Sequence, residues 1–519
     1  MTWTGHAKEA ADEYAGFRSN HGILKMAAEM DVKGKSLKMQ SVRFPKKEVR
    51  GIRYLSQIAG WSLRGLGYFS RERMARFGQA GFALVLALAS TSAFCEEADN
   101  RPLVTSFNSS GYDLFNKFVA APGNVVFSPY SIGSAMAMVS SGAAGDTATE
   151  MASVLHQQLD HDRTDAANAK VLAILKDYST PQVALTCPDG MSLTVNRCES
   201  VKRPDQGCPD MAYSQGNRCV ATPINRRSAS LRVANALMLT KDAIASDIYV
   251  RRLEHDYAAQ VFRNARLEQV NGWVGRMTEG TIDHIIDSLP KRGIVLINAV
   301  YFNQAWRMPF TRATTTNDDF HLTANTAIKV ATMHQRGYFA MVSRPGFRAI
   351  RLPYSVESLS MMVILPDTVD GTTALAQRLD ASELTKLSVA FREREVYATL
   401  SLPRFKTSFT AELKSRYQQL GLIKPFDEDR ADFSGMTGVP KEEVKAWIDK
   451  ILHRTTIDVT EVGTEAAAAT ATSLVEITSA ERPRPELFTV DRPFLFYITD
   501  DNTGAILFAG RISDPSKAN

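Results

Sequence analysis

This 519-residue chain has almost no excess of either charge sign outside residues 1–73. Residues 1–73 hold 14 Lys and Arg against 7 Asp and Glu, whereas the rest of the chain holds 47 basic against 49 acidic side chains. A body so close to electrical neutrality has no electrostatic basis for binding a phosphate backbone. We therefore expect no nucleic-acid partner.

The sequence also lacks the motifs of the common enzyme classes. It has no G-x-S-x-G nucleophile turn, no H-E-x-x-H zinc motif, no phosphate-binding loop and no G-x-G-x-x-G after a strand. Its nine histidines do not pair at the spacing of metal ligands. We expect that the protein is not an enzyme and that it binds no metal and no other cofactor.

No apolar run reaches the ~20 residues that a membrane-spanning helix needs. A short run, Phe82–Ala89, follows a basic start at Met74 and precedes small residues and then Glu96. This order is typical of a secretory signal peptide over residues 74–95, with cleavage after Ala93 or Cys95. A membrane anchor is the alternative interpretation.

An internal signal peptide has two consequences. It predicts that translation starts at Met74, so that residues 1–73 are a non-native or disordered extension. It also predicts that residues 96–519 are secreted or extracellular, with the periplasm as the alternative, and that they have no membrane partner.

Cysteine is rare, and four of the five cysteines form one repeat. Each copy begins with Cys-Pro-Asp and ends with Asn-Arg-Cys, giving the pairs Cys187 and Cys198, then Cys208 and Cys219. Three pairings are open, and the repeat favours the two local ones, which make two disulfide-closed hairpins within residues 183–224. A zinc site is the alternative, but it usually needs close pairs such as C-x-x-C.

Helical patterns lie mostly early in the chain and strand patterns mostly late, which favours an α+β fold. The expected helices are Leu103–Val119, Ser131–Val139, Ala148–Leu155, Asp165–Tyr178 and Phe409–Leu420. The expected strands are Asn124–Pro129, Gly293–Phe302, Leu359–Leu365, Val396–Leu402, Leu487–Val490, Phe494–Ile498 and Ala505–Gly510.

Residues 461–486 form an alanine-rich segment between two expected strands. Taken alone, it is a short helix followed by a linker, but such a short alanine stretch is too short for a stable isolated helix. As a strand, it places small or uncharged residues on one face and Glu465 and Ser473 on the other. The first face holds Thr464, Ala466, Ala468, Thr470, Thr472 and Leu474. Such a face can enter a sheet without burying a charge, and Gly463 gives the backbone freedom at its start.

The stretch Gly463–Thr470 (GTEAAAAT) closely resembles the hinge of inhibitory serpins, and the resemblance extends over about residues 103–516. It includes, in order, Asn124–Ile132, Gly142–Thr147, Asn298–Phe302 with Trp306 and Phe310, Leu402–Phe405, Asp432–Gly435, Asp491–Phe496 and Leu507–Arg511. This resemblance implies three β-sheets, about eight or nine helices and an exposed reactive-centre loop. We expect a secreted serpin of bacterial origin, with residues 96–519 as its serpin domain.

The resemblance also implies how the chain acts. A target serine protease, or alternatively a cysteine protease, would attack the loop and form an acyl-enzyme. The cleaved loop would then insert into the central sheet and distort the protease. Hinge residues would be Gly463, Thr464, Glu465, Ala466, Ala467, Ala468, Ala469 and Thr470.

Five further residues fall on family positions that control opening of the central sheet: Ser128, Ser131, Asn298, Trp306 and His453. Each polar member also fits an ordinary buried polar residue with satisfied hydrogen bonds, and Trp306 also fits simple core packing. Their joint match favours the gating role.

The position of the reactive bond stays open. Counting from the hinge gives Ile477–Thr478, and counting back from Pro493 gives the neighbourhood of Arg482. Because Arg482 is followed by proline, a trypsin-like target is disfavoured. Ile477–Thr478 is preferred, with cleavage after Glu476 or Ala480 as alternatives, which suits elastase-like or subtilisin-like proteases.

Three functions remain open for this chain: a protease inhibitor, a non-inhibitory serpin that binds or carries a ligand, and an enzyme. The uncharged inserting face favours the inhibitor, and we expect a monomer. The cysteine-rich insertion is either tolerated decoration or a docking surface for a protease or ligand.

Overall fold

The computed structural model describes residues 99–179, 185–186, 192–194, 197–201, 213–215, 218–221, 224–225, 230–240, 243–289, 292–464 and 484–518. Within them lie ten α-helices: α4 (Arg101–Phe118), α5 (Pro129–Ser140), α6 (Gly145–Val154), α7 (His161–Asp177), α8 (Asp247–Asp256), α9 (Leu267–Met277), α10 (Thr372–Arg378), α11 (Ala381–Ala390), α12 (Lys414–Gln419) and α13 (Ser434–Thr437). Two short 3₁₀-helices are η3 (Arg312–Thr314) and η4 (Lys424–Phe426).

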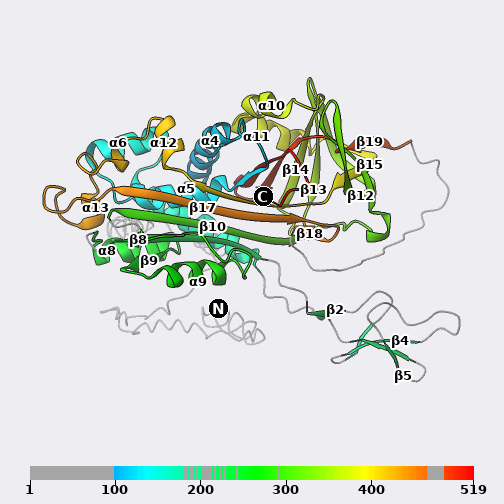
Figure 1. Ribbon diagram of the computed structural model, residues 1–519, viewed down its shortest axis with the longest axis horizontal. Helices are drawn as coiled ribbons and strands as arrows, with labels where there is room; N and C mark the ends of the chain where they lie inside the picture. Colours follow the sequence, from blue (N-terminus) through cyan, green and yellow to red (C-terminus); the bar gives the residue numbers. More distant parts are fainter. Residues whose placement is uncertain are drawn as a thin grey trace, which may run out of the picture. The chain divides into compact units, whose positions relative to one another are not determined.

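The central sheet has six strands in the order β16-β17-β18-β10-β8-β9 (Figure 1). They are β16 (Phe405–Glu412), β17 (Ile448–Val459), β18 (Gly463–Thr464), β10 (Ile294–Ala305), β8 (Ser230–Leu239) and β9 (Gln260–Arg263). The long strands β10 and β17 pair in parallel, whereas β10 and β8 pair antiparallel.

Strand β10 is buried on both faces, which explains why its sequence is almost wholly apolar. On one face of β10, Val295, Ile297 and Ala299 pack against α9, which contributes Trp273 to the same apolar cluster. The alternate residues of β10, such as Leu296, face the main core with α4, α5 and the second sheet. Because side chains of a strand alternate between its faces, Asn298 points to the side that carries α5.

The second sheet follows the path β1-β21-β20-β14-β13-β12-β15-β19, and β11 pairs with β12 beside it. Its strands are β1 (Val125–Phe127), β11 (Thr316–Thr323), β12 (Thr326–Arg344), β13 (Phe347–Pro353), β14 (Leu359–Pro366), β15 (Glu395–Pro403), β19 (Glu486–Thr489), β20 (Phe494–Asp500) and β21 (Ile506–Ile512). The 19-residue β12 joins two parts of this sheet, because it pairs with β13 at one end and β15 over its middle.

Two small sheets belong to the cysteine-rich insertion between α7 and β8. One pairs β2 (Leu185–Thr186) with β7 (Ile224–Asn225), and the other has the order β3-β4-β6-β5. Its strands are β3 (Ser192–Thr194), β4 (Arg197–Val201), β5 (Tyr213–Gln215) and β6 (Arg218–Ala221). Each cysteine repeat thus contributes one antiparallel strand pair, and β4 pairs with β6 to join the two copies.

The expected α+β fold is confirmed, with two differences in detail. The expected helix Phe409–Leu420 is wrong in its first half: β16 continues to Glu412, and only Lys414–Gln419 are helical. Phe405, Thr407 and Ala411 are buried while Lys406, Thr410 and Glu412 are exposed, so a period of two applies there. The other difference is that the two sheets expected beside the central one form a single path through β12.

No helix of the described part of the chain is long and apolar enough to cross a membrane. Several expectations fall outside the described residues. These are the extension 1–73, the signal peptide 74–95, and the side chains of Cys187, Cys198, Cys208 and Cys219.

Candidate functional site: the seam between β10 and β17

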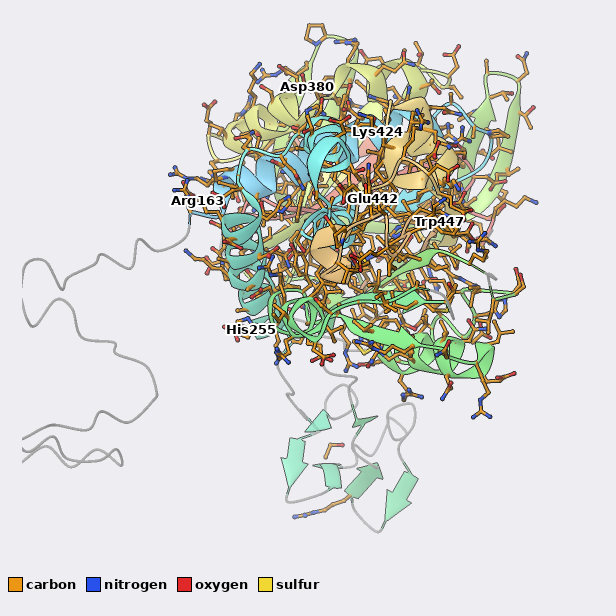
Figure 2. All side chains as sticks on the ribbon, turned by 90° about the vertical axis from the view of Figure 1, so that its left-hand side faces the viewer. Arg163, His255, Asp380, Lys424, Glu442 and Trp447 are labelled. Atoms are coloured by element: carbon orange, nitrogen blue, oxygen red, sulfur yellow. The ribbon has the colours of Figure 1, made fainter. Side chains whose placement is uncertain are left out.

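The seam is the line along which Ile294–Val300 of β10 pair with Ile448–Thr455 of β17. At its closed end, the Ile294 N–H donates to the carbonyl of Trp447 over 2.8 Å. Figure 2 views the molecule from the end that carries α6, α12 and α13, where Trp447 is labelled. The parallel pairing stops at Val300 and Thr455, so the two strands are no longer paired with each other toward the opposite end.

That opposite end is filled by the hinge pair, Gly463 and Thr464, which form β18. Thr464 pairs with Gln304 of β10 on one side and with Val459 of β17 on the other. The chain reaches this position by a tight turn after β17, in which the Thr460 N–H donates to the Gly463 carbonyl over 2.9 Å. The alanine-rich segment 461–486 therefore begins between β10 and β17, beyond the end of their direct pairing.

The Thr464 side chain points into the core and is fully buried (0 % exposed). Its hydroxyl lies 2.7 Å from the Tyr354 hydroxyl, and either oxygen can donate. Directly opposite residues of paired strands share a face, so Thr464 shares the core-facing side of Gln304 and Val459. The face on which Thr464 lies is the one the sequence predicts to insert.

Trp306 holds the turn before the hinge pair. Its backbone N–H donates to the Val462 carbonyl and its indole Nε1–H to the Thr460 carbonyl, each over 2.9 Å. The ring is stacked on Tyr354, with 4.5 Å between centroids and 12° between planes. Trp306 and Tyr354 therefore fix the backbone and the side chain of the same short segment.

Gly463 is required by a close backbone approach. A Cβ atom there would lie 2.2 Å from the Gln304 carbonyl oxygen and 2.7 Å from the Ala305 Cα. Its φ lies outside the left-handed region, so the conformational freedom predicted from the sequence is not what this structure uses.

A polar cluster lies midway along the seam, where Asn298 and His453 are directly paired. The Asn298 amide donates to the Ser131 hydroxyl over 2.5 Å and to Asn235 Oδ1 over 2.7 Å. Asn235 on β8 donates in turn to the Ser134 hydroxyl over 3.1 Å. The cluster thus connects three strands of the central sheet to α5.

His453 joins β17 to this cluster through both ring nitrogens. Nδ1 lies 2.6 Å from Asn298 Oδ1, and the Ser128 N–H donates to Nε2 over 3.4 Å. Since Nε2 accepts, the proton of the neutral ring lies on Nδ1 and is donated to Asn298. Burial lowers the pKa of His453 to about 3, so the ring is neutral at ordinary pH.

Ser128 also determines where α5 begins. Its hydroxyl accepts from the Ser131 N–H over 3.1 Å, as an N-cap residue does. Ser128 therefore links the first turn of α5 to His453 of β17. Strand opening at this point breaks hydrogen bonds of buried groups, which is costly.

The structure brings together four of the five expected gating residues in one cluster, Ser128, Ser131, Asn298 and His453. It places Trp306 at the hinge end. Asn235, Ser134 and Tyr354 were missed from the sequence. Asn235 carries a usable signal, because it is a lone amide on a face of β8 whose other members are Leu231, Val233, Leu237 and Leu239. Tyr354 has no such local signal.

The rest of the expected hinge, Glu465–Thr470, lies outside the described residues, as do Glu476, Ile477, Thr478, Ala480 and Arg482. The described residues contain no group of three or more His, Cys, Asp or Glu that could hold a metal ion.

Comparison with known proteins adds the family. The model of the family described as "Serpin (serine protease inhibitor)" matches residues 105–515. The chain belongs to the serpin family. An uncharacterized serpin-like protein of Thermococcus kodakarensis is 31% identical over 426 residues, covering 81% of this chain and 87% of its own. Human leukocyte elastase inhibitor is 31% identical over 416 residues, covering 76% and 93%.

Among solved structures, human thyroxine-binding globulin in complex with thyroxine resembles this serpin with a TM-score of 0.62. The identity is 21%, and 81% of this chain and 100% of that chain are covered. At this identity the likeness concerns the fold alone. Because the relatives include archaeal and human proteins, they do not support the expectation of bacterial origin.

Proposed function

We propose that this serpin is a secreted, monomeric inhibitor of serine proteases that acts as a single-use substrate. The protease's serine oxygen attacks a loop carbonyl carbon, the peptide bond breaks, and the new amino terminus leaves. The remaining acyl ester links the protease to the hinge side of the loop. Insertion of that side along the seam then displaces the protease before water can hydrolyse the ester.

The observation that carries this proposal is the position of the hinge pair. Thr464 already lies between β10 and β17 with its side chain in the core. In a continued strand, alternation assigns Ala466 and Ala468 to the same face, and both are small and uncharged. Continued insertion thus adds strand pairing and buries small side chains without burying a charge.

A trapping mechanism also needs a native state that is held short of its most stable form by a kinetic barrier. The Asn298–His453 contact supports this, because a strand inserted between β10 and β17 must separate these two side chains. The barrier is then set by hydrogen bonds that are fully buried and have to break before insertion proceeds. Disulfides in the cysteine repeat and export are part of the same proposal, because an oxidising compartment favours both.

The test mixes the full chain with an elastase-like, a subtilisin-like and a trypsin-like serine protease. The products are separated on denaturing gels. We expect a covalent complex with the first or second protease. N-terminal sequencing of the released C-terminal fragment then identifies the reactive bond.

Two matched variants test the mechanism. Thr464→Arg introduces a charge on the inserting face, whereas Glu465→Arg introduces the same residue on the opposite face. We expect the first to lose complex formation and to be cleaved as a substrate, and the second to keep it. Cleavage of the unchanged chain by every protease, without any stable complex, would contradict inhibition and favour a non-inhibitory serpin that binds or carries a ligand.

A further inference from the structure

A pocket of about 390 Å³ is lined on one side by Trp306, the residue that holds the turn before the hinge pair. It is formed by the chain just after β10, the middle of β12, the end of β13 and the chain that follows α11. Its size falls within the ~300–1,000 Å³ range of small-molecule sites. It lies beside the seam and shares only Trp306 and Phe310 with the hinge, and the inhibitory mechanism proposed above assigns no ligand to it.

The apolar part of this pocket is mostly aromatic. Trp306, Phe310, Phe339 and Phe391 are buried and line it, and the exposed Tyr338 lies at its rim. Flat aromatic walls suit a ligand that is itself apolar or aromatic, because such rings pack edge to face or offset.

Part of the charged lining is already paired within the protein. Arg351 and Asp501 form an ion pair, and the Arg351 Nε donates to Ser360 over 2.9 Å. Arg392 lies 3.9 Å from the same Asp501, which is beyond hydrogen-bond distance.

Arg307, Glu357 and Glu395 also line the pocket, and their side chains have no hydrogen bond or ion pair within the described residues. Arg307, Glu357 and Glu395 therefore remain available to a ligand, and Arg392 is held only by its long ion pair with Asp501. A ligand with one charge of each sign can pair with both kinds of group.

We propose that this pocket binds a zwitterion with an apolar or aromatic body, the chemistry of a hydrophobic dipeptide. The ammonium group pairs with Glu357 or Glu395, the carboxylate with Arg307 or Arg392, and the side chains pack on the aromatic walls. The pocket shares Trp306 and Phe310 with the hinge, since the Phe310 N–H donates to the Glu461 carbonyl over 2.8 Å. A bound dipeptide therefore stabilises Trp306 and Phe310, which hold the turn before the hinge pair through hydrogen bonds.

The probe is the free dipeptide leucyl-phenylalanine, measured by titration calorimetry with the full chain. We expect saturable binding of one molecule per chain. The N-acetylated and the C-amidated forms are each expected to bind about tenfold more weakly, because each loses one charged contact. Bound dipeptide is also expected to slow hydrogen exchange of the Trp306 and Phe310 amides.

Two variants locate the binding. Ala340→Trp fills the pocket, and Ala327→Trp makes the same change at an exposed position of the same strand. We expect the first to lose binding at least tenfold and the second to leave it unchanged.

If Ala340→Trp does not fold, a double variant tests the charges instead: Glu357→Gln together with Glu395→Gln. We expect it to bind the free dipeptide about tenfold more weakly. Absence of saturable heat with the unchanged chain, or equal affinity in the pocket variants, overturns the proposal. Both results are independent of protease inhibition.

Discussion

The two neighbours of β10 are held in different ways. On one side β8 pairs antiparallel with it over Ile294–Asn303, an unbroken ladder of ten residues. On the other side β17 pairs in parallel over seven residues, with an irregularity at Ile294 and Val295. Parallel pairs are slightly less stable per residue, so the seam has the weaker backbone ladder.

Side chains compensate for this difference at a single level of the sheet. Asn298 donates toward β8 and α5 and accepts from His453 of β17, so one amide joins both neighbours. The seam is therefore closed by a few buried polar contacts, whereas the β8 side is closed by its continuous ladder. Three predictions address this difference.

The largest effect is expected from Asn298→Ala. It leaves the His453 Nδ1–H and the Asn235 oxygen without their partner, and each unsatisfied buried group costs about 1–3 kcal/mol. We expect a loss of about 3 kcal/mol in the free energy of unfolding, measured by urea denaturation. Hydrogen exchange should increase along β17 more than along β8.

Asn235→Ala is the matched control, because it removes the same side chain from the β8 side of the cluster. It breaks the bonds to Ser134 and Asn298 but leaves the Asn298–His453 contact. We expect a smaller loss, with exchange increased mainly along β8. Equal increases on β17 in both variants would show that the two sides do not differ as described.

A pH dependence of stability is expected from His453. Its effect per pH unit is smaller than the effect of Asn298→Ala. Its pKa is about 3 in the folded chain and near 6.5 when unfolded. Between these values the unfolded state binds one more proton, so stability rises with pH and falls on acidification below about pH 6.5. The slope from this one group is at most about 1.4 kcal/mol per pH unit, and it disappears below about pH 3.

The measurement compares unfolding midpoints at pH 7, 6, 5 and 4 for the unchanged chain and for His453→Gln, which does not titrate. Asp165 opposes His453, because burial raises its pKa to about 6 and its contribution is lost as pH rises toward that value. The difference between the two chains cancels Asp165. Parallel pH profiles would mean that His453 is not held neutral.

The smallest effect on stability is expected from Gly463→Ala. The added Cβ meets backbone atoms of Gln304 and Ala305, so the hinge pair has to leave the seam. Only two paired residues are lost, and we expect a change of about 1 kcal/mol or less in the free energy of unfolding. Hydrogen exchange at the Trp306 and Phe310 amides should nevertheless rise about tenfold, because their acceptors lie in this turn.

Gly337→Ala serves as the control, since its added Cβ would have no heavy atom closer than 3.8 Å. It should change neither stability nor exchange at the hinge. A normal exchange rate in Gly463→Ala would indicate that the turn is held without the hinge pair.

Much of the fold follows from local sequence patterns. The apolar run of β10 and the alternation in β15 each predict the element that is found. The failure at Phe409–Leu420 has an equally local cause. Phe405, Thr407 and Ala411 have a period of two, but the apolar residues that follow also fit a helical period.

The sequence by itself determined the family, the order of the elements and the uncharged face that begins at Thr464, because these depend on residue types and their spacing. Only the tertiary structure decided that Thr464 lies against Tyr354, that Gly463 is needed for a close backbone approach, and that Asn235 completes the cluster at His453. These contacts join residues far apart in the chain, and their geometry depends on how the strands are paired and in which register.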